Sequence, residues 1–170
     1  YLFSLYQGEA LGEEQSVIGE IDEAKIPVTG NSRFGCWICT MVKEDKSLKA
    51  FIERGETWLE PLRDYRNWLI SLRAAPGARE YKRRNGTMYR KADGSLGMGP
   101  FTMETRKEML RKLLQLEVDT GLSLITLDEL KQIDAFWDNE GDLSRRSLVD
   151  IYRNVTGKML PWDKYKRPIF

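Results

Sequence analysis

The sequence contains no histidine and only two cysteines among its 170 residues. The lack of histidine removes the commonest general base, every Ser–His or Cys–His nucleophile pair, and any zinc site that combines cysteine and histidine from this chain alone. Cys36 and Cys39 form a CxxC motif. Two cysteines at this spacing cannot staple a domain of this size, so they indicate metal or redox chemistry rather than a structural disulfide.

Long apolar segments are also missing. No run approaches the roughly 18 apolar residues that a membrane span needs, and the first residues lack the charged and then apolar layout of a secretory signal. The sequence therefore predicts a soluble protein with no membrane partner. It begins at Tyr1 rather than at methionine, so we expect it to be a piece of a longer protein.

Helical periodicity predicts a mainly α fold. Because 41% of the residues are hydrophobic, the chain can bury one good core, and we expect one compact unit. In it, a loop-rich cysteine-motif segment over residues 1–45 precedes a helical domain over residues 46–170. Apolar spacing predicts a first helix over residues 57–73, ended by Pro76 and Gly77. Its inward face consists of Trp58, Leu62, Tyr65, Leu69 and Leu72.

Three more helices are predicted towards the C-terminus. One centres on Leu110, the next starts at the capping box formed by Thr126 and Glu129, and the last is ended by Gly157 and Pro161. Their inward residues are Met103, Leu110, Leu113 and Leu114, then Leu127, Leu130, Ile133 and Trp137, then Leu148, Ile151, Tyr152 and Val155.

Charge is balanced overall but unevenly distributed. The 27 Lys and Arg residues face 26 Asp and Glu residues, which argues against a dedicated nucleic-acid coat. Residues 1–30 carry six acidic groups and one basic group, whereas residues 79–91 carry six basic groups and one acidic group. The two segments therefore have opposite net charge.

The basic stretch lies in a glycine-rich region, residues 77–100, that predicts a loop or a small β-hairpin turning at Asn85 and Gly86. Its cations alternate with Tyr81 and Tyr89, a composition suited to holding phosphates and stacking on bases. Candidate contacts to nucleic acid or to a partner protein are Lys82, Arg83 and Arg84. A solvated loop, or a partner for the acidic N-terminal segment, is an equally good interpretation.

The residues around CxxC leave three interpretations open: metal or cluster ligation, a redox pair, and two thiols packed in a core. A thiol–disulfide protein is disfavoured because no βαβ pattern surrounds the motif. Trp37, between the cysteines, is suited to shielding them from water, and ordinary burial is the alternative. Arg33 is suited to hydrogen-bonding cluster sulfur or a substrate phosphate, or to bridging to Glu44 or Asp45.

The segment GNSRFGCWICTMVKEDKSL, residues 30–48, resembles the signature of the DndC-type sulfurtransferases of bacterial DNA phosphorothioation, relatives of the phosphoadenosine-phosphosulfate reductases. The likeness continues in the family's order through WLEPLRDYRNWL, YKRRNG, GPFTMETRKEMLRKLL and LITLDELKQI. It spans most of residues 3–137. The first segment is specific, and the later ones gain weight from their order.

The resemblance implies a protein of two halves. In the family, an N-terminal half carries an SGGKDS-type loop that cleaves ATP, and the C-terminal half contributes cysteines to a 4Fe–4S cluster. Sulfur from a cysteine desulfurase replaces a non-bridging oxygen of the DNA backbone. No SGGKDS-like loop occurs in this chain. We therefore expect the C-terminal half of a cytoplasmic bacterial enzyme, inactive alone, with DNA, a cysteine desulfurase and other phosphorothioation proteins as partners.

On this resemblance, Cys36 and Cys39 are ligands of the cluster iron. The family pattern has two further cysteines where this chain has Gln15 and Thr29. A cluster would then need ligands from the missing half, a second copy or another donor. The alternative hypothesis is an interaction module that keeps the fold, lacks a cluster, and docks DNA or other pathway proteins.

Overall fold

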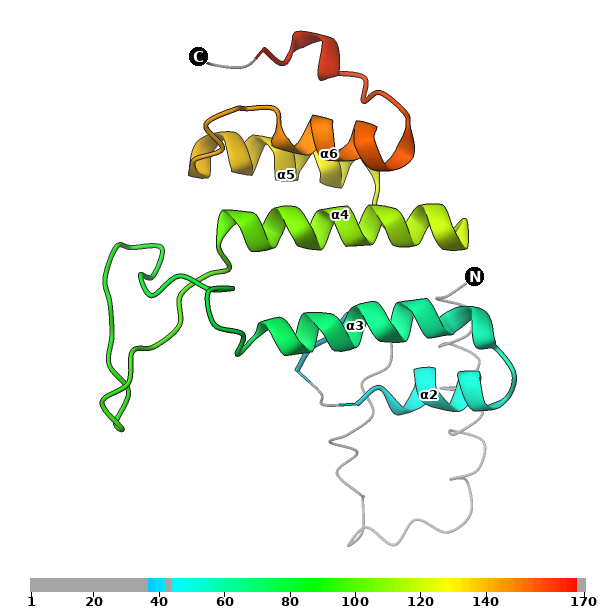
Figure 1. Ribbon diagram of the computed structural model, residues 1–170, viewed down its shortest axis with the longest axis horizontal. Helices are drawn as coiled ribbons and strands as arrows, with labels where there is room; N and C mark the ends of the chain where they lie inside the picture. Colours follow the sequence, from blue (N-terminus) through cyan, green and yellow to red (C-terminus); the bar gives the residue numbers. More distant parts are fainter. Residues whose placement is uncertain (1–36, 42–43, 168–170) are drawn as a thin grey trace, which may run out of the picture. The chain divides into compact units, whose positions relative to one another are not determined.

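The computed structural model describes residues 37–41 and 44–167, and these residues are mainly helical, which confirms the predicted fold class (Figure 1). The helices are α2 (Lys46–Glu53), α3 (Glu60–Leu72), α4 (Met103–Thr120), α5 (Leu127–Glu140) and α6 (Ser147–Thr156). Short 3-10 turns cover Thr57–Leu59 and Asp163–Tyr165. In this part of the chain, none of the helices has the length and apolar character needed to cross a bilayer.

The chain divides into two compact units, residues 1–70 and residues 71–170. The division falls near the end of α3, whereas the loop-rich segment predicted from the sequence ends at residue 45. Among the described residues, helical structure begins at Lys46, directly after that segment.

Helix α2 of the first unit begins at an aspartate cap. The Asp45 side chain accepts a hydrogen bond from the backbone N–H of Leu48, with an O–N distance of 3.0 Å. This bond satisfies one of the N–H groups that a helix start leaves without a partner. Leu48 and Phe51 are buried, so the short helix is held by one apolar face.

Helix α3 follows a 3-10 turn, and together they cover nearly all of the first predicted helix. Leu62 and Leu69 are buried, as the apolar spacing predicts. The third buried residue of α3 is Arg66, whose exposed fraction is 1%. Trp58 lies in the 3-10 turn and is half-buried. The inward face of α3 is therefore narrower and more polar than the sequence suggests.

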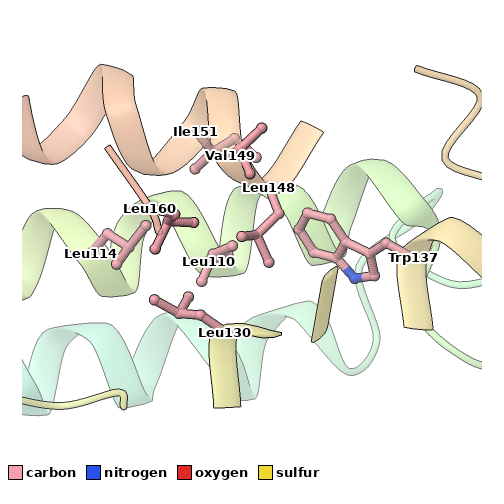
Figure 2. Packing of buried hydrophobic residues seen from close by; sticks show 8 residues of the cluster. All are labelled: Leu110, Leu114, Leu130, Trp137, Leu148, Val149, Ile151 and Leu160. Atoms are coloured by element: carbon pink, nitrogen blue, oxygen red, sulfur yellow. The ribbon is translucent and has the colours of Figure 1, made fainter. Parts of the chain in front are cut away.

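The core of the second unit lies among α4, α5 and α6 (Figure 2). Its buried members are Leu110, Leu114, Leu130, Trp137, Leu148, Val149, Ile151 and Leu160. Helical spacing predicted most of them, and Val149 and Leu160 are additions. Truncating a buried leucine in such a core costs about 2–5 kcal/mol, because burial is lost and a cavity forms.

The predicted capping box starts α5. The Thr126 side chain accepts a hydrogen bond from the Glu129 backbone N–H at 3.2 Å, and the Glu129 side chain accepts one from the Thr126 backbone N–H at 2.8 Å. At the other ends of the helices, α4, α5 and α6 are each followed by a glycine with left-handed backbone. One of these is Gly157, the predicted stop of the last helix.

Helix α6 is capped by a carboxylate from outside the helix. Asp142 is buried and accepts hydrogen bonds from the Ser147 backbone N–H at 3.0 Å and from the Ser147 hydroxyl at 2.6 Å. It also accepts a bond from the Ser144 hydroxyl at 3.1 Å, and the Lys107 ammonium lies 3.4 Å away. The loop between α5 and α6 is thus folded around one carboxylate.

Two more buried aspartates fasten the segment after α6. Asp134 on α5 accepts a hydrogen bond from the Trp162 indole at 2.8 Å, and the Lys166 ammonium lies 3.0 Å away. Asp163 pairs with Arg146 at 3.0 Å and also with Arg153. Buried charges are tolerated only when they are paired. Each of these contacts joins a residue after α6 to α5, to α6 or to the residue that precedes α6, so together they hold the C-terminal segment against both helices.

Asp142→Ala is expected to lower the free energy of unfolding by about 1–3 kcal/mol, because it leaves the start of α6 and two serine hydroxyls without their acceptor. Urea unfolding at pH 7 measures this change. Asp119→Asn is the matched control, since Asp119 is exposed on α4, and it should change stability by less than about 0.5 kcal/mol. Equal effects would contradict the capping role of Asp142.

The same carboxylate gives a pH dependence. Burial acts to raise the pKa of Asp142, but the hydrogen bonds from Ser147, with help from Lys107 and Ser144, outweigh burial and hold the pKa below its usual value. Its stabilisation is therefore complete above the unfolded pKa of about 3.9 and is lost as pH falls through the lower folded pKa. The stability difference between wild type and Asp142→Asn should shrink on acidification; a constant difference would contradict the assignment.

Candidate functional site

The basic stretch and the segment after it form three short arms, residues 79–101, which we name the basic meander. It is the green segment that precedes α4 in Figure 1. The Glu80 backbone N–H donates to the Pro100 carbonyl at 2.8 Å, and the Gly99 N–H donates to the Glu80 carbonyl at 2.6 Å, which joins the first and third arms. Within the meander the pairing consists of isolated bridges, not continuous strands.

Two turns of the same design connect the arms. In the first, the Asn85 side-chain oxygen accepts hydrogen bonds from the Thr87 backbone N–H at 3.1 Å and hydroxyl at 2.7 Å. In the second, the Asp93 carboxylate accepts from the Ser95 N–H at 2.9 Å and hydroxyl at 2.6 Å. The glycine inside each turn has φ of 80°, a conformation that glycine adopts without strain. The predicted turn at Asn85 is therefore present, and a second one repeats it.

The cations predicted as contacts lie on the exposed part of the meander, which covers residues 80–95. The Arg84 side chain is 77% exposed, and its guanidinium lies 3.9 Å from a carboxylate oxygen of Glu140. An ion pair this open contributes at most about 1 kcal/mol, so Arg84 can exchange Glu140 for another anion at little cost. Lys82 and Arg83 are exposed on the same arm.

The base of the meander is tied to the helices through Arg106 on α4. The Arg106 side chain donates to the Phe101 carbonyl at 3.1 Å, and its guanidinium also pairs with Glu140 at the end of α5. The hydrogen bond from Arg106 lowers the pKa of Glu140; burial opposes this shift, and the charges of Arg106 and Arg84 add to it. Glu140 therefore keeps its charge and holds two arginines.

Arg83 is held differently from its neighbours. Its guanidinium carbon lies 4.1 Å from the centre of the Tyr89 ring, on the second arm. Tyr89 in turn lies against Gly97 on the third arm, where a Cβ atom would sit 1.8 Å from a ring carbon of Tyr89. One contact series thus crosses all three arms, and the arginine at its end has a defined position.

The cysteine motif is described only from Trp37 onward, so Cys36 and Arg33 lie outside the described residues, as do Gln15 and Thr29. Cys39 is a free, half-buried thiol. Both carboxylates suggested as alternative partners of Arg33 have other roles, since Glu44 pairs with Lys49 at 3.1 Å and Asp45 caps α2.

Trp37 packs against helix α3. Its ring centre lies 6.0 Å from that of Tyr65, which lies 5.7 Å from that of Trp68. Burial raises the pKa of Tyr65 to about 12. The residue between the two cysteines is therefore part of an aromatic cluster, and whether it also shields the thiols stays a prediction.

A 4Fe–4S cluster needs four thiolates or equivalent ligands. The sequence supplies two cysteines. Within residues 37–41 and 44–167, no group of three or more Cys, His, Asp or Glu side chains is arranged to hold a metal ion. The chain's own thiolates therefore complete at most half of such a cluster.

Compared with protein-family models, curated proteins and solved structures, the chain matches none. The candidate site thus depends on its own residues: an exposed cationic meander in the second unit and a CxxC motif in the first. Sequence reasoning found the cations and the cysteines, but not Glu140 or Gly97.

Tyr65 should ionise only well above the ordinary tyrosine pKa of about 10, because its phenolate would be buried. We expect Trp37→Ala to open the ring to water and to move this pKa from about 12 towards the ordinary value of about 10. NMR titration of the tyrosine Cζ signals measures both values, and Tyr152→Phe is the control that should leave Tyr65 unchanged. An unaltered Tyr65 pKa in Trp37→Ala would contradict the packing of the motif against α3.

Proposed function

We propose that this chain is the C-terminal part of a sulfurtransferase that inserts sulfur into the DNA backbone, and that its basic meander contacts DNA phosphates. The observation that carries the proposal is the meander itself: residues 80–95 are all exposed and carry five cations, with one arginine held in place by an aromatic ring. Exposed lysines and arginines that neutralise phosphates release counterions, which is the main source of affinity for a DNA backbone.

The cations have distinct roles in this proposal. Arg83 is the positioned contact, while Lys82 and Arg84 are mobile contacts that add charge. Arg84 reaches a phosphate by leaving Glu140, and the weak pair between them makes this exchange easy. Arg33, close to the cysteines in sequence, is proposed as a further contact to phosphate or sulfur.

Cys36 and Cys39 are proposed to handle sulfur in the same protein. As thiolates they supply two ligands to the iron of a 4Fe–4S cluster, and the remaining ligands come from another chain or from the ATP-cleaving half. When bound, the cluster would supply redox-active iron and sulfide. ATP cleavage belongs to that other half, and a cysteine desulfurase is the proposed sulfur donor. The chain alone is then a binding part and not a complete enzyme.

A second candidate function is a cluster-free module that docks DNA or other phosphorothioation proteins in the bacterial cytoplasm. The presence of only two cysteines favours it. The basic meander would serve both functions equally, because its contacts with the residues that the structure describes do not involve Cys39. The two candidates therefore differ in iron and sulfide content, not in DNA affinity.

The triple variant Lys82→Ala, Arg83→Ala, Arg84→Ala should bind a 20-base-pair duplex at least about tenfold more weakly than wild type at roughly 0.1 M salt. The slope of log affinity against log salt should also fall by about 2–3, because three phosphate contacts are lost. Fluorescence anisotropy across a salt series measures both quantities.

The matched control removes the same charge elsewhere: Lys112→Ala, Lys131→Ala, Lys158→Ala. These lysines are exposed on or after the three helices of the second unit. If this variant loses as much affinity as the meander variant, the contact is a property of net charge, and the meander is not the DNA site. Circular dichroism confirms that both variants are folded.

Iron and acid-labile sulfide, measured after anaerobic purification and reconstitution, separate the two candidates. A cluster should give matching iron and sulfide with absorption near roughly 400 nm, and Cys36→Ala or Cys39→Ala should abolish all three signals. A colourless, iron-free, folded protein would reject the cluster and favour the interaction module. Thr40→Ala is the control that should leave the iron content unchanged.

A further inference from the structure

The basic meander has little core of its own. Its tyrosines are exposed, Tyr81 by 55% and Tyr89 by 40%, and so is Met88 by 58%. A hairpin without a buried face is marginally stable in water, so its shape depends on a few specific contacts. For the exposed part of the meander, these contacts include the two turns, the backbone hydrogen bond from the Gly97 N–H to the Tyr89 carbonyl, and the packing of the Tyr89 ring.

Two glycines on the third arm make that packing possible. A Cβ atom at Gly97 would lie 1.8 Å from a ring carbon of Tyr89, and one at Gly99 would lie 2.1 Å from the Lys82 carbonyl oxygen. Neither distance is compatible with a side chain. The third arm therefore approaches the other two more closely than residues with a side chain would allow, and Gly97 leaves the space that the Tyr89 ring occupies.

The Tyr89 ring is also in contact with Arg83, whose guanidinium carbon lies 4.1 Å from the ring centre. A guanidinium stacked on a ring uses its flat face for the ring and keeps its N–H groups, which lie in its plane, for hydrogen bonds. Those N–H groups match the paired oxygens of a phosphate. The stack favours this arrangement of Arg83 before any ligand arrives, which lowers the entropy cost of binding.

The same contacts argue against a base-stacking role for Tyr89. A ring that stacks on an unpaired base needs an open face, as on the platforms of single-strand-binding proteins. Tyr89 already lies against Arg83 and Gly97. Tyr81, in contrast, has no ring or cation contact in the described part of the chain, and it provides the comparison.

We infer that Tyr89, seated on Gly97, is a positioning residue that presents Arg83 to a backbone phosphate of double-stranded DNA, and that Tyr89 does not stack on unpaired bases. This inference rests on the proposed function for its ligand. The ligand class of the meander is then duplex DNA. The meander contacts the phosphates and does not distinguish base sequences.

The test compares Tyr89→Ala, Tyr89→Phe, Gly97→Ala and Tyr81→Ala by anisotropy on a 20-base-pair duplex and on one of its strands. Tyr89→Ala and Gly97→Ala should weaken duplex binding about three- to tenfold, while Tyr89→Phe, which keeps the ring, and Tyr81→Ala should not. The salt slope should stay unchanged in all four, because no charge is removed. Arg83→Ala should lower it by about 1.

A second readout does not depend on DNA. In the free protein, the Arg83 Nε–H signal should be shifted by the Tyr89 ring in NMR spectra, and this shift should vanish in Tyr89→Ala and Gly97→Ala but persist in Tyr89→Phe. A missing shift in wild type would overturn the positioning role even if the meander binds DNA.

The outcomes separate this inference from the proposed function. If Tyr89→Ala weakens binding to the single strand more than to the duplex, Tyr89 stacks on bases and the inference is wrong while the DNA function stands. If Arg83→Ala weakens duplex binding but Tyr89→Ala does not, the positioning role is wrong. If the wild-type protein binds neither the duplex nor the single strand, both the ligand of this inference and the proposed function are wrong. The contact between Tyr89 and Arg83 then depends on the NMR shift alone.

Discussion

The second unit depends on one arginine that joins three of its parts. Arg106 on α4 donates to the backbone of Phe101, where the meander ends, and pairs with Glu140 at the end of α5. Glu140 also reaches Arg84 on the exposed arm of the meander. The Glu140 carboxylate therefore makes a close ion pair with Arg106 at the base of the meander and a looser one with Arg84 on the exposed arm. This arrangement holds the meander to the helices and leaves its outer cations able to exchange partners.

Three buried carboxylates have a comparable role elsewhere in the second unit. Asp134, Asp142 and Asp163 each accept several hydrogen bonds or ion pairs and leave no charge uncompensated. Burial raises the pKa of Asp134, and its contacts with Lys166 and Trp162 only partly oppose this. Removing either partner of such a pair costs more than the pair itself contributes, because the remaining charge stays buried. The polar contacts of this unit therefore specify one arrangement of the loops around an ordinary apolar core.

The local features of this chain could be read from its sequence, and the distant ones could not. The capping box at Thr126, the burial of Leu130 and Trp137 and the turn at Asn85 are encoded within a few neighbouring residues, so periodicity and turn chemistry predict them, although Leu127, also predicted inward, is exposed. The link between Arg106 and Glu140 joins residues far apart in the chain, and the seat of Tyr89 on Gly97 exists only after the arms have paired. Composition identifies the basic stretch, but it does not tell which cation lies on a ring and which is exposed without one. The roles of Cys36 and Arg33 stay predictions, because both lie outside the described residues.

The lack of histidine also affects how binding by the meander would depend on pH. Histidine is the side chain whose ordinary pKa brings its charge change between pH 5 and 8, and the meander contains none. Glu140, which competes with a ligand for Arg84, keeps its charge, because the hydrogen bond from Arg106 lowers its pKa. We therefore expect neither the attraction of the meander for an anion nor the competition of Glu140 for Arg84 to change with pH in this range. On the proposed function, contact between the meander and a phosphate backbone would therefore be controlled by salt, through the counterions released, and hardly by pH.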